Sequence, residues 1–184
     1  GLKPFQFLGL VREGKNISEA KPFGFNSEPN LRTLAFDIEV YNPRGAPRPD
    51  KDPVIMLSYA GEDSGVFTYK PVNLPFVKQV KNEAEIITSF SALLKEKDVE
   101  LLVGYNDVDF DLPYLRDRAK QLKTDFILGR DGKSSFIAQQ RGLFTHAKIK
   151  GRLHLDLYAA AKFLGLIGAL KTKRLTLGEV YSEL

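Results

Sequence analysis

The sequence contains no cysteine in its 184 residues, so neither a disulfide scaffold nor a thiolate zinc site can form. It also lacks an apolar run near the length needed to cross a membrane. The start, Gly1 to Pro4, does not have the charged and then apolar layout of a signal peptide. These absences predict a protein that has no membrane partner and works in a reducing cytoplasm.

The residues that are present are typical of one globular domain. Hydrophobic residues make up 43% of the chain and charged residues 27%, and the length allows a sizeable core. The net charge of +4 and the pI near 9.2 favour a polyanionic partner. Many basic proteins bind no nucleic acid, so charge alone leaves the partner open.

Both ends of the chain suggest a piece of a longer polypeptide. Gly1 stands where an initiator methionine is expected. Near the other end, Leu175, Val180, Tyr181 and Leu184 fall roughly at helical spacing, and no C-cap glycine or proline follows them. We therefore expect the polypeptide to continue beyond its last residue.

Hydrophobic periodicity and turn residues predict alternating strands and helices. The expected strands are residues 4–11, 32–41, 53–60, 65–70, 99–103 and 153–155, with a further hairpin within 126–150. The expected helices are residues 83–97, 111–122 and 156–166. The expected loops are 42–52 and 12–30, and the second of these has room for a short strand. A strand meander followed by helix, strand and helix gives an α/β fold with a mixed β-sheet flanked by helices.

Two carboxylates, Asp37 and Glu39, lie inside the apolar strand at residues 32–41. Residues i and i+2 of a strand share a face, so both side chains point the same way, opposite to the apolar neighbours. Neighbouring carboxylates repel each other unless cations lie between them, and two-metal phosphodiester hydrolysis needs such a cluster. The alternative is a half-exposed strand with an acidic outer face.

A third carboxylate, Asp111, follows the predicted strand at residues 99–103. Sites in such sheets form at strand ends, so Asp111 can reach the acidic face of strand 32–41. The alternative is an ordinary helix N-cap before Leu112 and Pro113. Asp107 and Asp109 are expected to be solvated loop acids.

Four segments agree in order and spacing with one protein family. Residues 36–41 (Phe-Asp-Ile-Glu-Val-Tyr) resemble the first exonuclease motif of family B DNA polymerases, and residues 105–115 (Tyr-Asn-x3-Phe-Asp-Leu-Pro-Tyr-Leu) resemble the second. Residues 151–158 and 175–181 resemble the segments that follow the family's hairpin. The agreement covers most of residues 30–184 and is hard to obtain by chance.

The resemblance implies an RNase H-like fold with a β-hairpin insertion and the proofreading 3′–5′ exonuclease of an archaeal-type DNA polymerase. It implies Asp37, Glu39 and Asp111 as catalytic metal ligands for Mg²⁺ or Mn²⁺, with two ions in the complete enzyme. Residues 31–184 would be the exonuclease domain, incomplete at its C-terminal side. Residues 1–30 match less clearly and would be a partial segment, for which a neighbouring domain is one source.

The resemblance also implies a substrate and partners. Tyr105, Asn106 and Phe110 would bind the terminal nucleotide of a single-stranded DNA 3′ end, although Phe110 is equally suited to packing. The remaining polymerase domains would be the other partners. Asp156 stands before a helix and outside the family's catalytic set, so an N-cap is expected. His146 and His154 are expected to be structural.

The family's third motif, Tyr-x3-Asp, is missing where the family order requires it. The spacing occurs at Tyr59 to Asp63 and at Tyr105 to Asp109, but neither pair follows residue 158. We therefore expect the isolated chain to be weak or inactive as a nuclease.

Two rival functions remain open. One is a non-catalytic nucleic-acid-binding or scaffold domain of a polymerase, and the other is a nuclease of the same fold that acts on RNA. The segment at residues 151–158 argues against the second. The basic residues of the C-terminal third suit either a solvated face or contact with backbone phosphates; they are Lys148, Lys150, Arg152, Lys171, Lys173 and Arg174.

Overall fold

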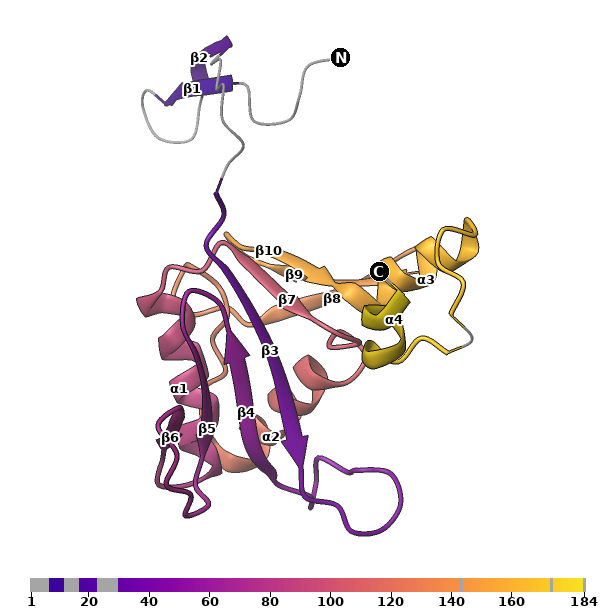
Figure 1. Cartoon of the computed structure of the whole chain (residues 1–184). Helices are drawn as coiled ribbons and strands as arrows, with labels where there is room; N and C mark the ends of the chain where they lie inside the picture. The colour runs from indigo at the N-terminus through magenta and orange to yellow at the C-terminus, as the bar shows by residue number, and fades with distance from the viewer. Residues whose placement is uncertain (1–6, 12–16, 23–29, 143, 173, 184) are drawn as a thin grey trace. The chain divides into compact units, whose positions relative to one another are not determined.

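The computed structural model describes residues 7–11, 17–22, 30–142, 144–172 and 174–183 (Figure 1). The chain divides into two units, residues 1–30 and 31–184. In the first unit, β1 (Phe7–Val11) pairs antiparallel with β2 (Ile17–Pro22). The strand expected at residues 4–11 is confirmed for Phe7–Val11, and residues 4–6 lie outside the described part.

The second unit is built on a six-stranded mixed sheet with the order β10-β7-β3-β4-β5-β6 (Figure 1). β3 pairs parallel with β7 and antiparallel with β4, so it lies inside the sheet, where both of its edges can be bonded. The strands are β3 (Thr33–Val40), β4 (Val54–Ala60), β5 (Ser64–Thr68), β6 (Val77–Gln79), β7 (Leu101–Gly104) and β10 (Leu153–Asp156).

The helices are α1 (Glu83–Glu96), α2 (Asp111–Leu122), α3 (Leu157–Leu166) and α4 (Leu177–Glu183). α1 begins where Asn82 accepts the Glu85 N–H at 3.0 Å, and its apolar stripe is buried. Phe90 of α1 packs on Phe36 of β3, with ring centroids 4.9 Å apart. In the described residues, no helix combines the length and apolarity that spanning a membrane requires.

A β-hairpin of β8 (Phe136–Arg141) and β9 (Phe144–Ile149) forms a separate two-stranded sheet between α2 and β10 in the chain. This arrangement is the expected RNase H-like α/β fold with a hairpin insertion. The short edge strand β6 was not expected, because three residues offer no alternation to detect.

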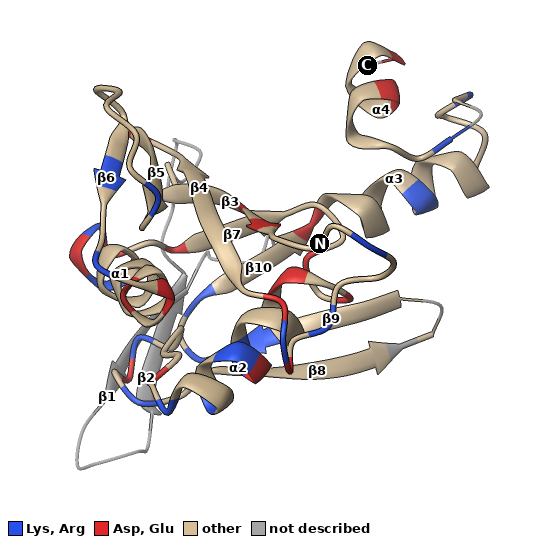
Figure 2. Ribbon diagram, turned by 90° about the horizontal axis from the view of Figure 1, so that it is seen from below, with Lys and Arg blue, Asp and Glu red and all other residues tan. Residues whose placement is uncertain are grey.

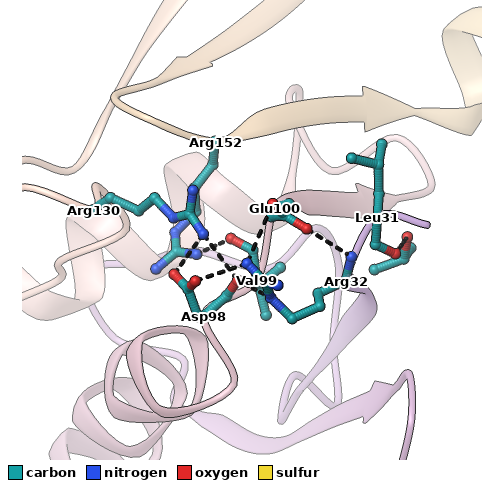
Figure 3. Close-up of polar contacts among 8 residues, drawn as sticks. Leu31, Arg32, Asp98, Val99, Glu100, Arg130 and Arg152 are labelled. Carbon is teal, nitrogen blue, oxygen red and sulfur yellow. Dashed lines mark hydrogen bonds and ion pairs between the residues drawn. The ribbon is translucent and has the colours of Figure 1, made fainter. Parts of the chain in front are cut away.

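A charged cluster joins the starting ends of β3, β7 and β10 (Figure 3). Asp98 contacts Arg32 at 2.7 Å and Arg130 at 2.5 Å. Arg152, at the start of β10, donates hydrogen bonds to the backbone carbonyls of Leu128 and Val99. Two nitrogens of the half-buried Arg152 guanidinium group are therefore engaged within the protein, so Arg152 contributes less to a solvated or phosphate-contacting face than the sequence predicts.

Candidate active site

The alternation predicted for β3 is confirmed. Phe36 and Ile38 are each 5% exposed and belong to the core, whereas Asp37 and Glu39 are exposed. The pairing with β4 shifts register between Glu39 and Val40. Such a bulge bends a strand and re-aims its side chains, and here it follows the acidic pair directly.

Asp37 lines an open groove of about 630 Å³ on one face of the sheet. The floor comes from β3, β4 and β7, and Leu157 of α3 and Leu177 of α4 contribute to its wall. Figure 2 shows acidic positions on β3 and at the start of α3, near the middle of this unit. The groove therefore presents a carboxylate inside a largely apolar channel.

Asp111 reaches β3, as its place after β7 predicted. It is the first residue of α2 and only 3% exposed, and its Oδ1 accepts the Ile38 N–H at 3.2 Å. The described pairing between β3 and β7 ends at Ala35, so the carboxylate takes the place of a strand partner further along β3. The N-cap alternative is wrong, because Phe110 occupies the N-cap position.

Burial, and then the charge of a neighbouring carboxylate, raise the pKa values of two of the acidic residues. Burial, and then the Asp37 charge, raise the pKa of Asp111 to about 7, against the opposing effect of the Ile38 N–H. The pKa of Asp37 is also raised, first by desolvation and then by the Glu39 charge. Solvent reaches Asp37, but the groove walls reduce its hydration. A cation placed beside these carboxylates would relieve both effects.

The acidic residues fit only part of a metal site. Carboxylate oxygens are the ligands that Mg²⁺ and Mn²⁺ prefer. Among the described residues, however, no three His, Cys, Asp or Glu side chains are placed so that they could hold one ion. Asp37 shares a face of β3 with Glu39 and its charge acts on Asp111, but the three carboxylates do not form such a group.

The predicted nucleotide-binding residues surround the same region. Tyr105 lines the groove, and its hydroxyl donates to the Leu175 carbonyl at 2.6 Å. Asn106 has a left-handed backbone with φ of 63°. Phe110 packs on Tyr114 with ring centroids 5.4 Å apart and is partly buried against the core, as the packing alternative requires.

Three polar residues near this region, Asp107, His154 and Asp156, form specific hydrogen bonds within the fold. Asp107 is fully buried, so the solvated-loop prediction is wrong for it, whereas Asp109 is exposed as expected. His154 forms a hydrogen bond with Asp107 at 2.7 Å, which confirms a structural role. Asp156 accepts the Tyr158 N–H as the N-cap of α3, as predicted.

Known proteins resemble this chain over most of its length. The family model "DNA polymerase family B, exonuclease domain" matches residues 11–167. The DNA polymerase of Methanocaldococcus jannaschii is 41% identical over 157 residues, which are 85% of this chain and 9% of that protein. The DNA polymerase of Pyrococcus glycovorans is 45% identical over 129 residues, 70% of this chain and 16% of that protein.

A solved structure of a family B DNA polymerase is also similar to this chain. The family B DNA polymerase from the hyperthermophilic archaeon Pyrobaculum calidifontis matches with a TM-score of 0.64 and 33% identity, over 83% of this chain and 20% of that chain. The chain thus spans less than a fifth of the length of either curated relative. By its sequence and its fold, it belongs to the exonuclease-domain family of family B DNA polymerases.

Proposed function

We propose that this chain is the proofreading 3′–5′ exonuclease domain of a DNA polymerase and removes the last nucleotide from a single-stranded DNA 3′ end. The observation that carries the proposal is the meeting of two motifs. The Asp111 carboxylate lies against β3, bonded to the N–H of Ile38, the residue after Asp37. The remaining polymerase domains are the proposed partners, and the cytoplasm is the proposed location.

Metal ions supply the chemistry that carboxylates alone lack. Exonuclease domains of this family depend on metal, and we assign two Mg²⁺ or Mn²⁺ ions to Asp37, Glu39 and Asp111 in the complete enzyme. When bound, such ions lower the pKa of water near neutrality and stabilise the leaving oxygen. The raised pKa values of Asp37 and Asp111 support this assignment, because unbalanced negative charge attracts cations.

The groove residues would hold the DNA end. Tyr105 offers a ring fixed by its hydroxyl, and stacking on aromatic rings binds bases with little sequence preference. Asn106 and Phe110 would shape the nucleotide pocket. Because these groups lie on the segment that ends at Asp111, the nucleotide pocket would directly precede one of the three carboxylates in the chain, while Asp37 and Glu39 come from β3.

One observation favours a second candidate, a non-catalytic nucleic-acid-binding or scaffold domain. The three carboxylates do not form a group that could hold an ion within the described residues. A domain of this kind would bind single-stranded DNA in the groove without cutting it.

The test uses a full-length polymerase that carries this domain and a 3′-labelled single-stranded DNA with Mg²⁺ or Mn²⁺. We expect Asp37→Ala to reduce degradation by about a hundredfold or more, because loss of a shared ligand unseats a metal, while primer extension stays intact. Asp109→Ala is the matched control, since Asp109 is an exposed acid that we assign no role. Wild-type binding without cleavage would favour the scaffold, and unchanged degradation in Asp37→Ala would refute the assignment of Asp37 as a metal ligand.

A further inference from the structure

The segment between β7 and α2 has little regular structure of its own. It runs from Tyr105 to Phe110, and Asn106 holds a left-handed backbone within it. Its backbone hydrogen bonds are local: the Phe110 N–H donates to the Asn106 carbonyl at 3.1 Å, and the Leu112 N–H of α2 donates to the Asp107 carbonyl at 2.9 Å. These bonds join the segment to α2 and not to the sheet. Its position therefore depends on groups that come from elsewhere in the fold.

Asp156, the last residue of β10, supplies the first of these contacts. Its Oδ1 accepts the Asn106 N–H at 2.9 Å, and its Oδ2 lies 3.4 Å from the Val108 N–H. The same carboxylate caps α3 through the Tyr158 N–H at 2.8 Å. One side chain thus fixes two backbone groups of the segment, from about 50 residues further along the chain.

His154 supplies the second contact, two residues earlier on the same side of β10. Its side chain is 2% exposed and contacts the fully buried Asp107 at 2.7 Å. Gly104 lets Asp107 pack closely, because a Cβ there would lie 2.3 Å from the Asp107 Cγ. Since all of these groups are buried or half-buried, the segment has little freedom to shift against β10.

The other end of the segment carries Asp111, which is bonded to the Ile38 N–H on β3. We propose that His154 and Asp156 are positioning residues that clamp the segment to β10 and thereby hold Asp111 in place against β3. The proposal rests on the proposed function only in treating Asp111 as an active-site carboxylate. It assigns to β10 a role in aligning the site, although neither residue touches the substrate.

Amide hydrogen exchange of this chain, without DNA or metal, tests the clamp directly. The Ile38 amide reports on Asp111 from a different strand. We expect Asp156→Ala and His154→Leu to speed exchange at Ile38 by about tenfold, because a loosened segment no longer holds the acceptor in place. His154→Gln, which can still donate to Asp107, should restore most of the protection.

A second set of amides separates the clamp from general loss of stability. Val66 and Val77 donate to Phe76 and Leu74 at the far side of the sheet, and their exchange should not change. Thr68→Val, the matched control, removes the hydroxyl that accepts the Lys70 N–H, so it should speed exchange at Lys70 and leave Ile38 unchanged.

Two results would overturn the proposal. In the first, exchange at Ile38, Val66 and Val77 rises equally in the clamp variants, which is global destabilisation. In the second, Asn106 and Val108 lose protection while Ile38 does not, so that the clamp is local and never reaches Asp111. Neither result depends on nuclease activity. A wild-type polymerase that fails to degrade DNA would refute the proposed function and leave this measurement valid.

Discussion

Two buried carboxylates in this molecule occupy nearly the same structural position. Glu83 is the first residue of α1 and Asp111 is the first residue of α2, and they are 7% and 3% exposed. Each accepts an N–H from a strand, Val54 for Glu83 at 2.9 Å and Ile38 for Asp111 at 3.2 Å. In both places the carboxylate at a helix start accepts a hydrogen bond from a strand amide.

Their charged neighbours are opposite. The Arg118 guanidinium, itself buried, makes a two-point contact with the Glu83 carboxylate and also donates to the Pro49 carbonyl. Asp111 instead faces the negative charges of Asp37 and Asp107, which raise its pKa further. The chain can thus neutralise a buried acid with its own arginine, but among the described residues no Lys or Arg forms an ion pair with Asp111. Buried acids with perturbed pKa values cluster at functional sites, so this environment supports the proposed metal site.

The largest effect is expected from Glu83→Gln. The substitution keeps the size of the side chain but leaves the Arg118 charge buried and uncompensated, and breaking such a pair costs about 3–5 kcal/mol. We expect the free energy of unfolding to fall by about 3 kcal/mol in urea titrations at pH 7.5. A change below about 1 kcal/mol would mean that solvent reaches Arg118 and that the comparison with Asp111 is invalid.

Replacing the Asp111 carboxylate by an amide should instead raise the free energy of unfolding. The pKa of Asp111 is about 7 in the folded chain, against 3.8 for an ordinary aspartate. Between these values the folded chain binds more protons than the unfolded chain, so its stability falls as the pH rises through this window. Asp111→Asn removes this loss. At pH 8 with EDTA we expect a stabilisation on the order of 2 kcal/mol, because one pKa unit is worth about 1.4 kcal/mol.

The pH dependence provides the internal control for Asp111→Asn. In urea titrations, the free energy of unfolding of Asp111→Asn should exceed that of the wild type only slightly at pH 4, where the wild-type carboxyl is protonated. At pH 8 the full increase should appear. A gain that is equal at both pH values would trace to packing and not to charge. In a full-length polymerase the same variant should lose exonuclease activity, so stability and activity would change in opposite directions.

A divalent metal ion should compensate the acidic residues beside β3 in the way that Arg118 compensates Glu83. If cations replace the missing arginine, Mn²⁺ should stabilise the wild-type chain, by about 1–2 kcal/mol at roughly ten times its dissociation constant. The effect should be smaller in Asp37→Asn and unchanged in Glu83→Gln, which lies outside the acidic groove. Thermal melts with and without Mn²⁺ at pH 7.5 measure it. Equal stabilisation of the wild type and Asp37→Asn would place the ion elsewhere.

The sequence predicted the parts of this comparison that depend on local pattern. The alternation of β3 put Asp37 and Glu39 on one face, and the helix at residues 111–122 was placed with its observed bounds. The position of Asp111 beside β3 was predicted from chain order, because Asp111 follows β7 and β7 pairs with β3. The role of Asp156 as the N-cap of α3 was also local and was confirmed.

Contacts between distant segments could not be predicted in this way. Asp107 lies among other polar residues in the sequence, and its burial depends on His154, 47 residues away. Asp156 has a second set of partners in Asn106 and Val108, which no capping pattern indicates. Arg118 of α2 pairs with Glu83 of α1, 35 residues away, and nothing in the local helix pattern indicates this partner. In each case the pairing partner is set by the tertiary arrangement of the elements, which local periodicity does not give.

The smallest effect is expected at the charged cluster that joins the strand starts, where an acid is paired but exposed. Arg130 and Arg32 lower the pKa of Asp98, so its pairs add stability above pH 4 that is lost as the pH falls further. Asp98 has a φ of 43°, which asparagine tolerates, so Asp98→Asn removes charge without straining the turn. Its urea midpoint should fall far less than that of Glu83→Gln. Salt screens exposed ion pairs much more than buried ones. In 1 M NaCl, Asp98→Asn should therefore have the urea midpoint of the wild type, whereas Glu83→Gln should still have a lower one. If the urea midpoint of Asp98→Asn stays lowered in 1 M NaCl, the charged cluster is shielded from solvent. The Asp98 and Glu83 pairs would then not differ in their exposure to solvent.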